Sequence, residues 1–161
     1  MWTDDLFDEL VRVWVRNGAR SADSARSVTD QIRAVFPDGQ VDRSSYEHLV
    51  HDMPGEDPDD HLHAAAAVSV APSVLLTANI ADFPAETFER LGVSVQHPDD
   101  YFVGLLGAVP DELLDVLLVM VGHRSRPPMT LEELLATLSR AGLKRFTAEV
   151  DKIGATTLGS D

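Results

Sequence analysis

Two short apolar segments on either side of a small helix constrain this chain more than any other feature. The segment SVLLT, 73–77, has an apolar centre, and VSVQ, 93–96, follows it after a short stretch, 85–91, with the composition of a helix. A strand, a short helix and a second strand form a βαβ unit, in which the two strands run parallel. Two parallel strands are too few for a sheet with helices on both faces. We therefore expect an α/β fold in which a further strand is missing or comes from another molecule.

The rest of the chain is predicted to be mostly helical. Thr3 can cap the first helix, and Trp2 can pack onto Phe7 across that cap. Thr130 and Glu133 have the spacing of a capping box. The predicted helices span residues 3–17, 22–35, 43–51, 59–70, 99–107, 110–121 and 144–152, and a further helix follows the Thr130 cap and ends near Gly142. We expect a disordered tail at 154–161.

Composition limits the classes of function. The 161 residues suffice for one ordinary domain, and the chain has no cysteine, which excludes disulfides and thiolate metal sites. It opens with no signal-like leader and has no apolar run long enough to span a bilayer, so we expect a cytoplasmic protein without membrane contact.

The net charge of −14 is unevenly distributed. Residues 51–100 carry ten acids and one Arg, whereas residues 1–50 carry nine acids and six Arg. Such a surface repels phosphate backbones unless cations or a basic patch intervene. The acidity can serve solubility alone, or it can mark a site for a divalent metal, which prefers clustered oxygen ligands.

Three carboxylates stand out by position. Asp60 begins an Ala-rich helix, where an acid is commonly explained by capping and the helix dipole. Asp82, with Asn79, follows the strand 73–77, and ligands of parallel sheets bind beyond the carboxyl ends of strands. Glu9 lies at the edge of the apolar stripe of its helix, where a carboxylate needs a partner, a proton or a metal.

Two histidines near Asp60 suggest a zinc site, but their spacing argues against one. His61 and His63 are two residues apart, so their rings lie on different faces of a helix and cannot easily share an ion. His63 follows Asp60 by three residues and lies on its face, where it can support Asp60 or contact a substrate. A surface or core histidine remains the alternative.

The order of these segments resembles the PIN-domain family of metal-dependent nucleases, which includes the VapC-type toxins of toxin–antitoxin pairs. The resemblance covers residues 2 to about 150 and rests on four segments, WTDDLFDELVRVW, DPDDHLHAAAAVS, VLLTANIADFP and GVSVQHPDDYFVGLL. It implies that Glu9, Asp60 and Asp82 act as catalytic residues and ligands of Mg²⁺ or Mn²⁺. The expected supporting residues are Asp57, Asp59, Thr77, Asn79 and His63. The family's first acid, at the end of its first strand, has no counterpart here.

The resemblance also implies an architecture. We expect a three-layer α/β/α PIN-like fold with a short parallel sheet, N-terminally incomplete, over residues 1–107. A C-terminal helical extension, 108–153, is expected to pack on it, with RPPMTLEELLATLSRAGLKRF as its most similar part.

Three functional hypotheses follow. The leading one is an endoribonuclease that cuts single-stranded RNA, either the toxin of a toxin–antitoxin pair or the larger part of a split nuclease, with an antitoxin or complementing chain as partner and a possible homodimer. The alternative is a catalytically inactive interaction module whose open sheet edge recruits a partner strand. The third, an antitoxin-like or immunity protein that masks a basic partner, rests on charge alone.

Overall fold

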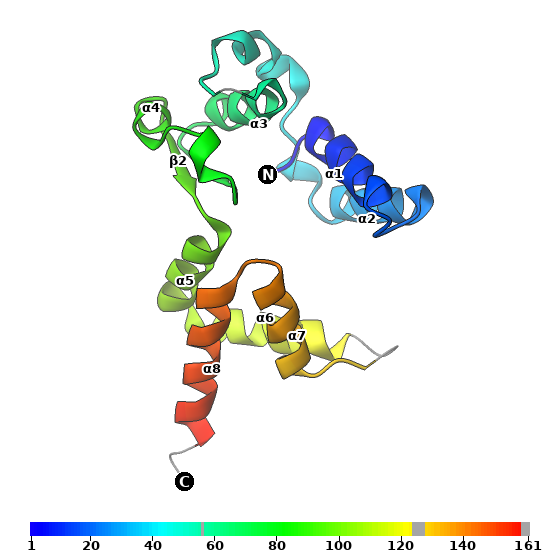
Figure 1. Ribbon diagram of the computed structural model, residues 1–161, viewed down its shortest axis with the longest axis vertical. Coiled ribbons are helices and arrows are strands. Elements are labelled where there is room, and N and C mark those ends of the chain that lie inside the picture. Colours follow the sequence, from blue (N-terminus) through cyan, green and yellow to red (C-terminus); the bar gives the residue numbers. More distant parts are fainter. Residues whose placement is uncertain (56, 124–127, 159–161) are drawn as a thin grey trace. The chain divides into compact units, whose positions relative to one another are not determined.

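The computed structural model describes residues 1–55, 57–123 and 128–158, and the chain forms two compact units (Figure 1). The N-terminal unit comprises residues 1–75 and 81–95, and the C-terminal unit comprises residues 76–80 and 96–161. The elements are α1 (Asp4–Arg16), α2 (Ala22–Val35), η1 (Pro37–Gly39), η2 (Arg43–Ser45), η3 (Glu47–Asp52), α3 (Pro58–Ser69), β1 (Ser73–Leu76), η4 (Ile80–Asp82), α4 (Ala85–Arg90), β2 (Val93–Gln96), α5 (Pro98–Ala108), α6 (Pro110–Gly122), α7 (Leu131–Arg140) and α8 (Lys144–Leu158), where η marks a 3₁₀ helix.

The predicted α/β class is confirmed, because β1 and β2 form a short parallel sheet among many helices. The core of the N-terminal unit joins the Ala-rich helix α3 to this sheet and to α4. Its most buried members are Ala64, Ala65, Tyr46, Phe88 and Val93. Small alanine side chains allow the backbone of α3 to lie close to its neighbours, so α3 can be buried although it offers little apolar surface of its own.

Local signals in the sequence correctly place the first helix. The Thr3 side chain accepts a hydrogen bond from the Leu6 amide and caps α1, and the rings of Trp2 and Phe7 stack with centroids 5.0 Å apart. The backbone of Trp2 also forms an isolated parallel bridge with Gln40.

The single helix expected at 43–51 is instead two short 3₁₀ helices, η2 and η3. Asp42 caps η2 by accepting from the Ser44 amide at 2.8 Å. Tyr46 follows η2, is 1% exposed and donates its hydroxyl proton to Asp5 of α1. Burial, with the Asp5 carboxylate as a further cause, raises the pKa of Tyr46 to about 12. Anchoring this side chain on the core takes precedence over continuing a regular α-helix.

The C-terminal unit is a bundle of α5 to α8 around its own apolar core. The buried residues of this core are Leu106, Leu113, Leu117, Leu134, Leu135, Phe146 and Val150. The capping box of Thr130 and Glu133 is present at the start of α7, as predicted. No helix in the described ranges is long and apolar enough to cross a bilayer.

Two boundaries differ from the expected ones. Helix α5 packs against α8 in the C-terminal unit, so the structure divides the chain near residue 96, whereas a division at 107/108 was expected. The tail expected to be disordered from residue 154 is helical as far as Leu158, and residues 159–161 lie outside the described residues.

A buried carboxylate explains why α5 and α8 pack together. Asp99, in the first turn of α5, is 7% exposed and accepts hydrogen bonds from the amides of Arg145 and Phe146 at 2.9 and 2.8 Å. These amides belong to the first turn of α8, which leaves them without an acceptor inside their own helix. Asp99 therefore caps α8 from a distant part of the chain. Next to it, Asp100 forms an exposed ion pair with Arg145.

Candidate metal-binding acidic site

The start of α3 carries three of the predicted acids. Asp57 is the N-cap, and its side chain accepts a hydrogen bond from the Asp59 amide at 2.9 Å. Asp59 and Asp60 follow in the first turn. The capping role considered for Asp60 therefore belongs to Asp57, and the half-buried Asp60 carboxylate needs another explanation.

A glycine places the loop before α3 against the turn that contains Asp82. Gly55 has a φ of +129°, and a Cβ atom at this position would lie 3.0 Å from the Asp82 carbonyl oxygen. His61 of α3 also contacts this loop, because its Nε2 lies 3.1 Å from the Gly55 carbonyl oxygen. The close approach of these two backbones requires glycine. Gly55 is not among the residues that the sequence predicts for the site.

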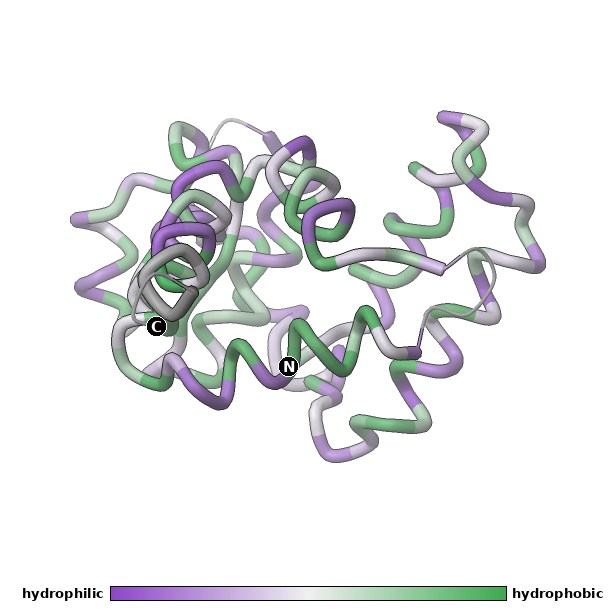
Figure 2. The backbone as a smooth tube through the Cα atoms, turned by 90° about the horizontal axis from the view of Figure 1, so that it is seen from below, coloured by the Kyte–Doolittle hydropathy of each residue, from purple (hydrophilic) through white to green (hydrophobic). Residues whose placement is uncertain are grey.

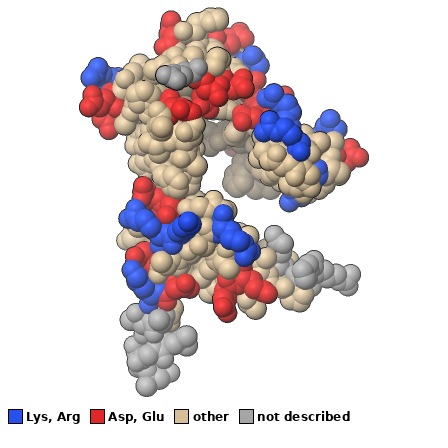
Figure 3. Space-filling model, in the orientation of Figure 1, with Lys and Arg blue, Asp and Glu red and all other residues tan. Residues whose placement is uncertain are grey.

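The carboxylates near Asp60 act on one another through their charges. Burial raises the pKa of Asp60, the carboxylates of Asp57, Asp82 and Glu9 raise it further, and His63 lowers it. These acids come from the start of α3, from η4 and from α1, which are far apart in the sequence. Figure 3 shows acidic side chains gathered on one face of the N-terminal unit. The site is therefore a concentration of negative charge that favours a bound cation or proton.

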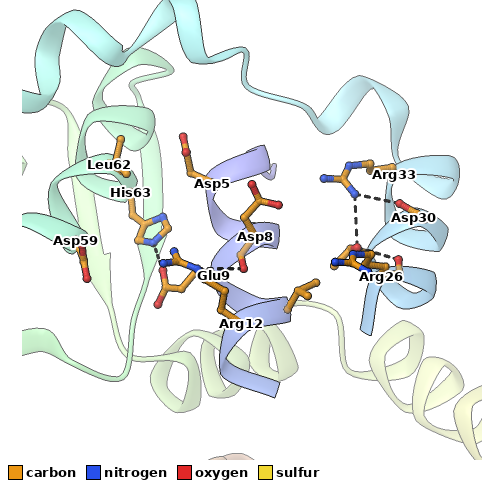
Figure 4. A pocket seen from close by; sticks show the side chains of 12 residues that line it. Asp5, Asp8, Glu9, Arg12, Arg26, Asp30, Arg33, Asp59, Leu62 and His63 are labelled. Atoms are coloured by element: carbon orange, nitrogen blue, oxygen red, sulfur yellow. Dashed lines mark hydrogen bonds and ion pairs between the residues drawn. The ribbon is translucent and has the colours of Figure 1, made fainter. Parts of the chain in front are cut away.

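Glu9 has a specific partner. Its Oε2 lies 2.7 Å from Nε2 of His63, so a protonated Nε2 donates to the carboxylate across the gap between α1 and α3 (Figure 4). The side chains of His63 and Glu9 are 19% and 44% exposed. The two histidines take separate partners, because His61 contacts Gly55 and His63 contacts Glu9.

A pocket of about 560 Å³ lies beside the Glu9–His63 pair. Its walls come from α1, α2 and α3, with acids on all three helices and arginines on α1 and α2 (Figure 4). The lining residues are Asp5, Asp8, Glu9, Val11, Arg12, Arg26, Thr29, Asp30, Arg33, Asp59, Leu62 and His63. Asp60 and Asp82 are not among them, so the pocket adjoins the acidic site without containing all of it.

Thr77 and Asn79, two expected supporting residues, form a local turn. The Asn79 amide donates to Thr77 Oγ1 at 3.0 Å. Both belong to the segment 76–80, which is grouped with the C-terminal unit, whereas the acids belong to the N-terminal unit.

The donor chemistry of the site fits a hard divalent cation, since every nearby acid offers carboxylate oxygens. Within residues 1–55, 57–123 and 128–158, however, no three His, Asp or Glu side chains are already arranged to hold one ion. The Glu9–His63 hydrogen bond engages one oxygen of a predicted ligand. A shared metal ion would therefore require these side chains to rearrange.

Replacing Gly55 by alanine tests how the site is positioned. We expect Gly55→Ala to lower the free energy of unfolding by about 2 kcal/mol, because it combines a positive φ with a contact to a rigid carbonyl. Gly142→Ala is the matched control, since Gly142 has a φ of +106° and no atom within 4 Å of an added Cβ. Urea unfolding of both variants gives the comparison. Equal losses would show that the contact with Asp82 contributes nothing.

Comparisons with known proteins point to one family. A family model described as the VapC50 C-terminal domain matches residues 98–152. The curated protein "Putative ribonuclease VapC50" of Mycobacterium tuberculosis (strain ATCC 25618 / H37Rv) is 26% identical over 140 residues, which cover 87% of this chain and 78% of that protein. No solved structure matches the chain. These matches support the predicted resemblance to VapC-like proteins, with the family model confined to residues 98–152 and the relative at 26% identity.

Proposed function

We propose that this protein is an endoribonuclease that uses Mg²⁺ or Mn²⁺ to cut single-stranded RNA, as the toxin of a toxin–antitoxin pair in the cytoplasm. The observation that carries the proposal is the raised pKa of Asp60, caused by burial and by carboxylates from separate elements. Acids that disfavour one another's ionised forms are typical of sites built for function. The similarity to "Putative ribonuclease VapC50" supports the same reaction class.

The proposal gives each acid a role. Asp60 and Asp82 hold the cation, Glu9 completes its oxygen ligands, and Asp57 keeps the start of α3 in place by capping it. When bound, a divalent ion lowers the pKa of its water and neutralises charge that develops on the phosphate. His63 orients the Glu9 carboxylate through the 2.7 Å hydrogen bond.

The pocket next to Glu9 offers a place for the RNA backbone. Arg12 and Arg26 line it and offer positive charge to a phosphate group. Arg26 forms one exposed ion pair with Asp23 at 3.9 Å, whereas Arg33 is engaged by both Asp4 and Asp30 at 2.8 and 3.1 Å. A chain with a net charge of −14 needs such local cations, together with the metal, to bind RNA. The proposal also includes an antitoxin as partner and a homodimer, which the resemblance to VapC-type toxins implies.

Metal-dependent cleavage is the direct test. We expect the wild-type chain to cut a labelled single-stranded RNA with Mn²⁺ or Mg²⁺, to stop with EDTA, and to leave double-stranded RNA intact. Asp82→Asn should reduce the rate by about 100-fold or more, because it removes a ligand. Asp111→Asn on α6 is the control for loss of one acid. Equal rates with and without EDTA would contradict the proposal.

An interaction module is the second candidate, and the edge of β1 favours it. The amides of Ser73 and Thr77 donate to Gly92 and Gln96, so alternate residues of β1 face β2. The backbone groups of Val74 and Leu76 then point to the other edge, which has no strand neighbour among the described residues. An edge of this kind accepts a partner strand. Absence both of cleavage and of any effect of divalent ions on the melting temperature would favour this candidate over the nuclease.

A further inference from the structure

Helix α6 carries apolar side chains on two sides. Leu113 and Leu117 are buried in the core of the C-terminal unit, whereas Val116, Val119 and Met120 are 52%, 55% and 44% exposed. The exposed residues are spaced by three and four positions, so they form a second stripe along the helix. Figure 2 shows the tube of α6 in green over most of its length. A helix that is apolar on both sides is normally covered on both sides.

Acids without cationic partners accompany this second stripe. Asp111, Glu112 and Asp115 are exposed on the N-terminal half of α6. None of them takes part in the ion pairs found among the described residues. The sequence has no Lys or Arg from 98 to 122, so the helices α5 and α6 supply no compensating charge of their own. The surface is apolar toward the end of α6 and negative toward its start.

These features disfavour a second copy of the chain as the occupant of this surface. Two copies would bring together chains that each carry a net charge of −14. A cationic partner gains from the same charges that repel a second copy, and a single helix can be covered by another single helix.

We propose that the exposed stripe of α6 docks an amphipathic, positively charged helix of a partner protein. The partner presents apolar side chains at helical spacing to Val116, Val119 and Met120, and Lys or Arg side chains to Glu112 and Asp115. This interface is independent of the proposed ribonuclease activity, because it uses none of the acidic-site residues.

A synthetic peptide probes this surface. The peptide is an 18-residue helix with leucines at positions i, i+3, i+4 and i+7 and arginines on both flanks. In its matched control glutamates replace the arginines and the leucines stay. Binding to the full chain is followed by fluorescence anisotropy and by ¹³C-methyl methionine NMR. Met120 reports on α6, Met1 reports on the apolar groove between α1 and α2, and Met53 reports on the core of the N-terminal unit.

Binding of the arginine peptide should shift the Met120 resonance and leave those of Met1 and Met53 in place. Val119→Asp should weaken binding by about tenfold or more, because it places a charge at the centre of the apolar contact. The double variant Glu112→Lys, Asp115→Lys should weaken binding and remove most of its salt dependence. Val35→Asp is the matched control, since Val35 is 67% exposed on α2 and the change is the same.

Four results would overturn the proposal. The first is binding of the glutamate peptide as tightly as the arginine peptide, which would mean that apolar contact alone accounts for binding. The second is a shift of Met1 in place of Met120, or loss of binding in Val35→Asp, which would locate the surface on the α1–α2 groove. The third is unchanged binding by a folded Val119→Asp chain, with folding verified by circular dichroism. The fourth is a wild-type dimer in sedimentation experiments that Val119→Asp dissociates, which would make a second copy the occupant.

Discussion

Replacing Asp60 by asparagine is expected to destroy cleavage and yet make the metal-free protein more stable at neutral pH. Burial and three neighbouring carboxylates disfavour the ionised form of Asp60 and raise its pKa. Asparagine has nearly the same shape and no charge, so it removes this repulsion. The rate of RNA cleavage should fall by about 100-fold or more, because a central ligand is lost.

The pH dependence of this gain has a definite sign. The folded-state pKa of Asp60 is raised, so its protonated form favours the fold below the unfolded value of about 3.9, and this contribution is lost as pH rises through the folded pKa. The stability difference between Asp60→Asn and wild type should therefore be absent in acid and full at pH 7. Thermal melts across this range in EDTA measure it.

Metal addition separates a ligand from an ordinary buried acid. At a concentration 100 times its Kd, a divalent ion should stabilise the wild type by about 2.7 kcal/mol, and it should stabilise Asp60→Asn far less. Asp23→Asn is the control, because Asp23 also lies in the first turn of a helix, is fully exposed and lines no part of the site. An Asp60→Asn chain that cleaves RNA normally would exclude Asp60 as a ligand. One that melts below wild type at pH 7 in EDTA would contradict the predicted repulsion at this position.

Removing the Asp99 carboxylate is expected to give the largest loss of stability in the C-terminal unit. Asp99→Ala leaves the partly buried amide of Arg145 and the buried amide of Phe146 without their acceptor, which should lower the free energy of unfolding by about 3 kcal/mol. The neighbouring Asp100→Ala breaks only an exposed ion pair and should cost about 0.5 kcal/mol. Urea unfolding followed by circular dichroism compares the two variants.

The pH dependence of the Asp99 cap runs opposite to that of Asp60. Burial acts to raise the pKa of Asp99, but the hydrogen bonds from Phe146 and Arg145, with the charges of Arg145 and His97, outweigh it and lower the pKa overall. A depressed folded pKa contributes stability above the unfolded value of about 3.9, and this contribution is lost as pH falls through the folded pKa. Acid should therefore remove most of the difference between wild type and Asp99→Ala. A difference that persists unchanged at low pH would mean that the carboxylate charge has no part in capping α8.

Several features of the fold followed directly from sequence patterns. The cap of α1 by Thr3, the capping box at Thr130 and the parallel pair of strands were all predicted and are present. The separate partners of His61 and His63 also agree with their spacing. These features depend on residues within one or two turns of each other, or on the periodicity of a single element, and both can be read from a linear pattern.

Other predictions failed where a distant contact outweighed a local tendency. The helix expected at 43–51 became 3₁₀ structure around the buried Tyr46. Helix α5 belongs to the C-terminal unit, because its Asp99 accepts a hydrogen bond from α8 and its apolar side chains pack in the same core as those of α8. Asp57 caps α3, although the adjacent Asp59 and Asp60 fit the same local pattern. Local preferences of about 1 kcal/mol are smaller than the energies of burying an aromatic ring or of pairing buried polar groups.

The sequence by itself determined which residue types are present and where each helix and strand can form, including a concentration of acids around α3. Only the tertiary structure decided that Glu9 meets His63, that Gly55 lies against Asp82 and that Asp99 caps α8. Each of these contacts depends on backbone positions set by the packing of other elements. Hydrogen bonds and charges act over a few ångströms, so their partners are unknown until the chain brings distant residues together.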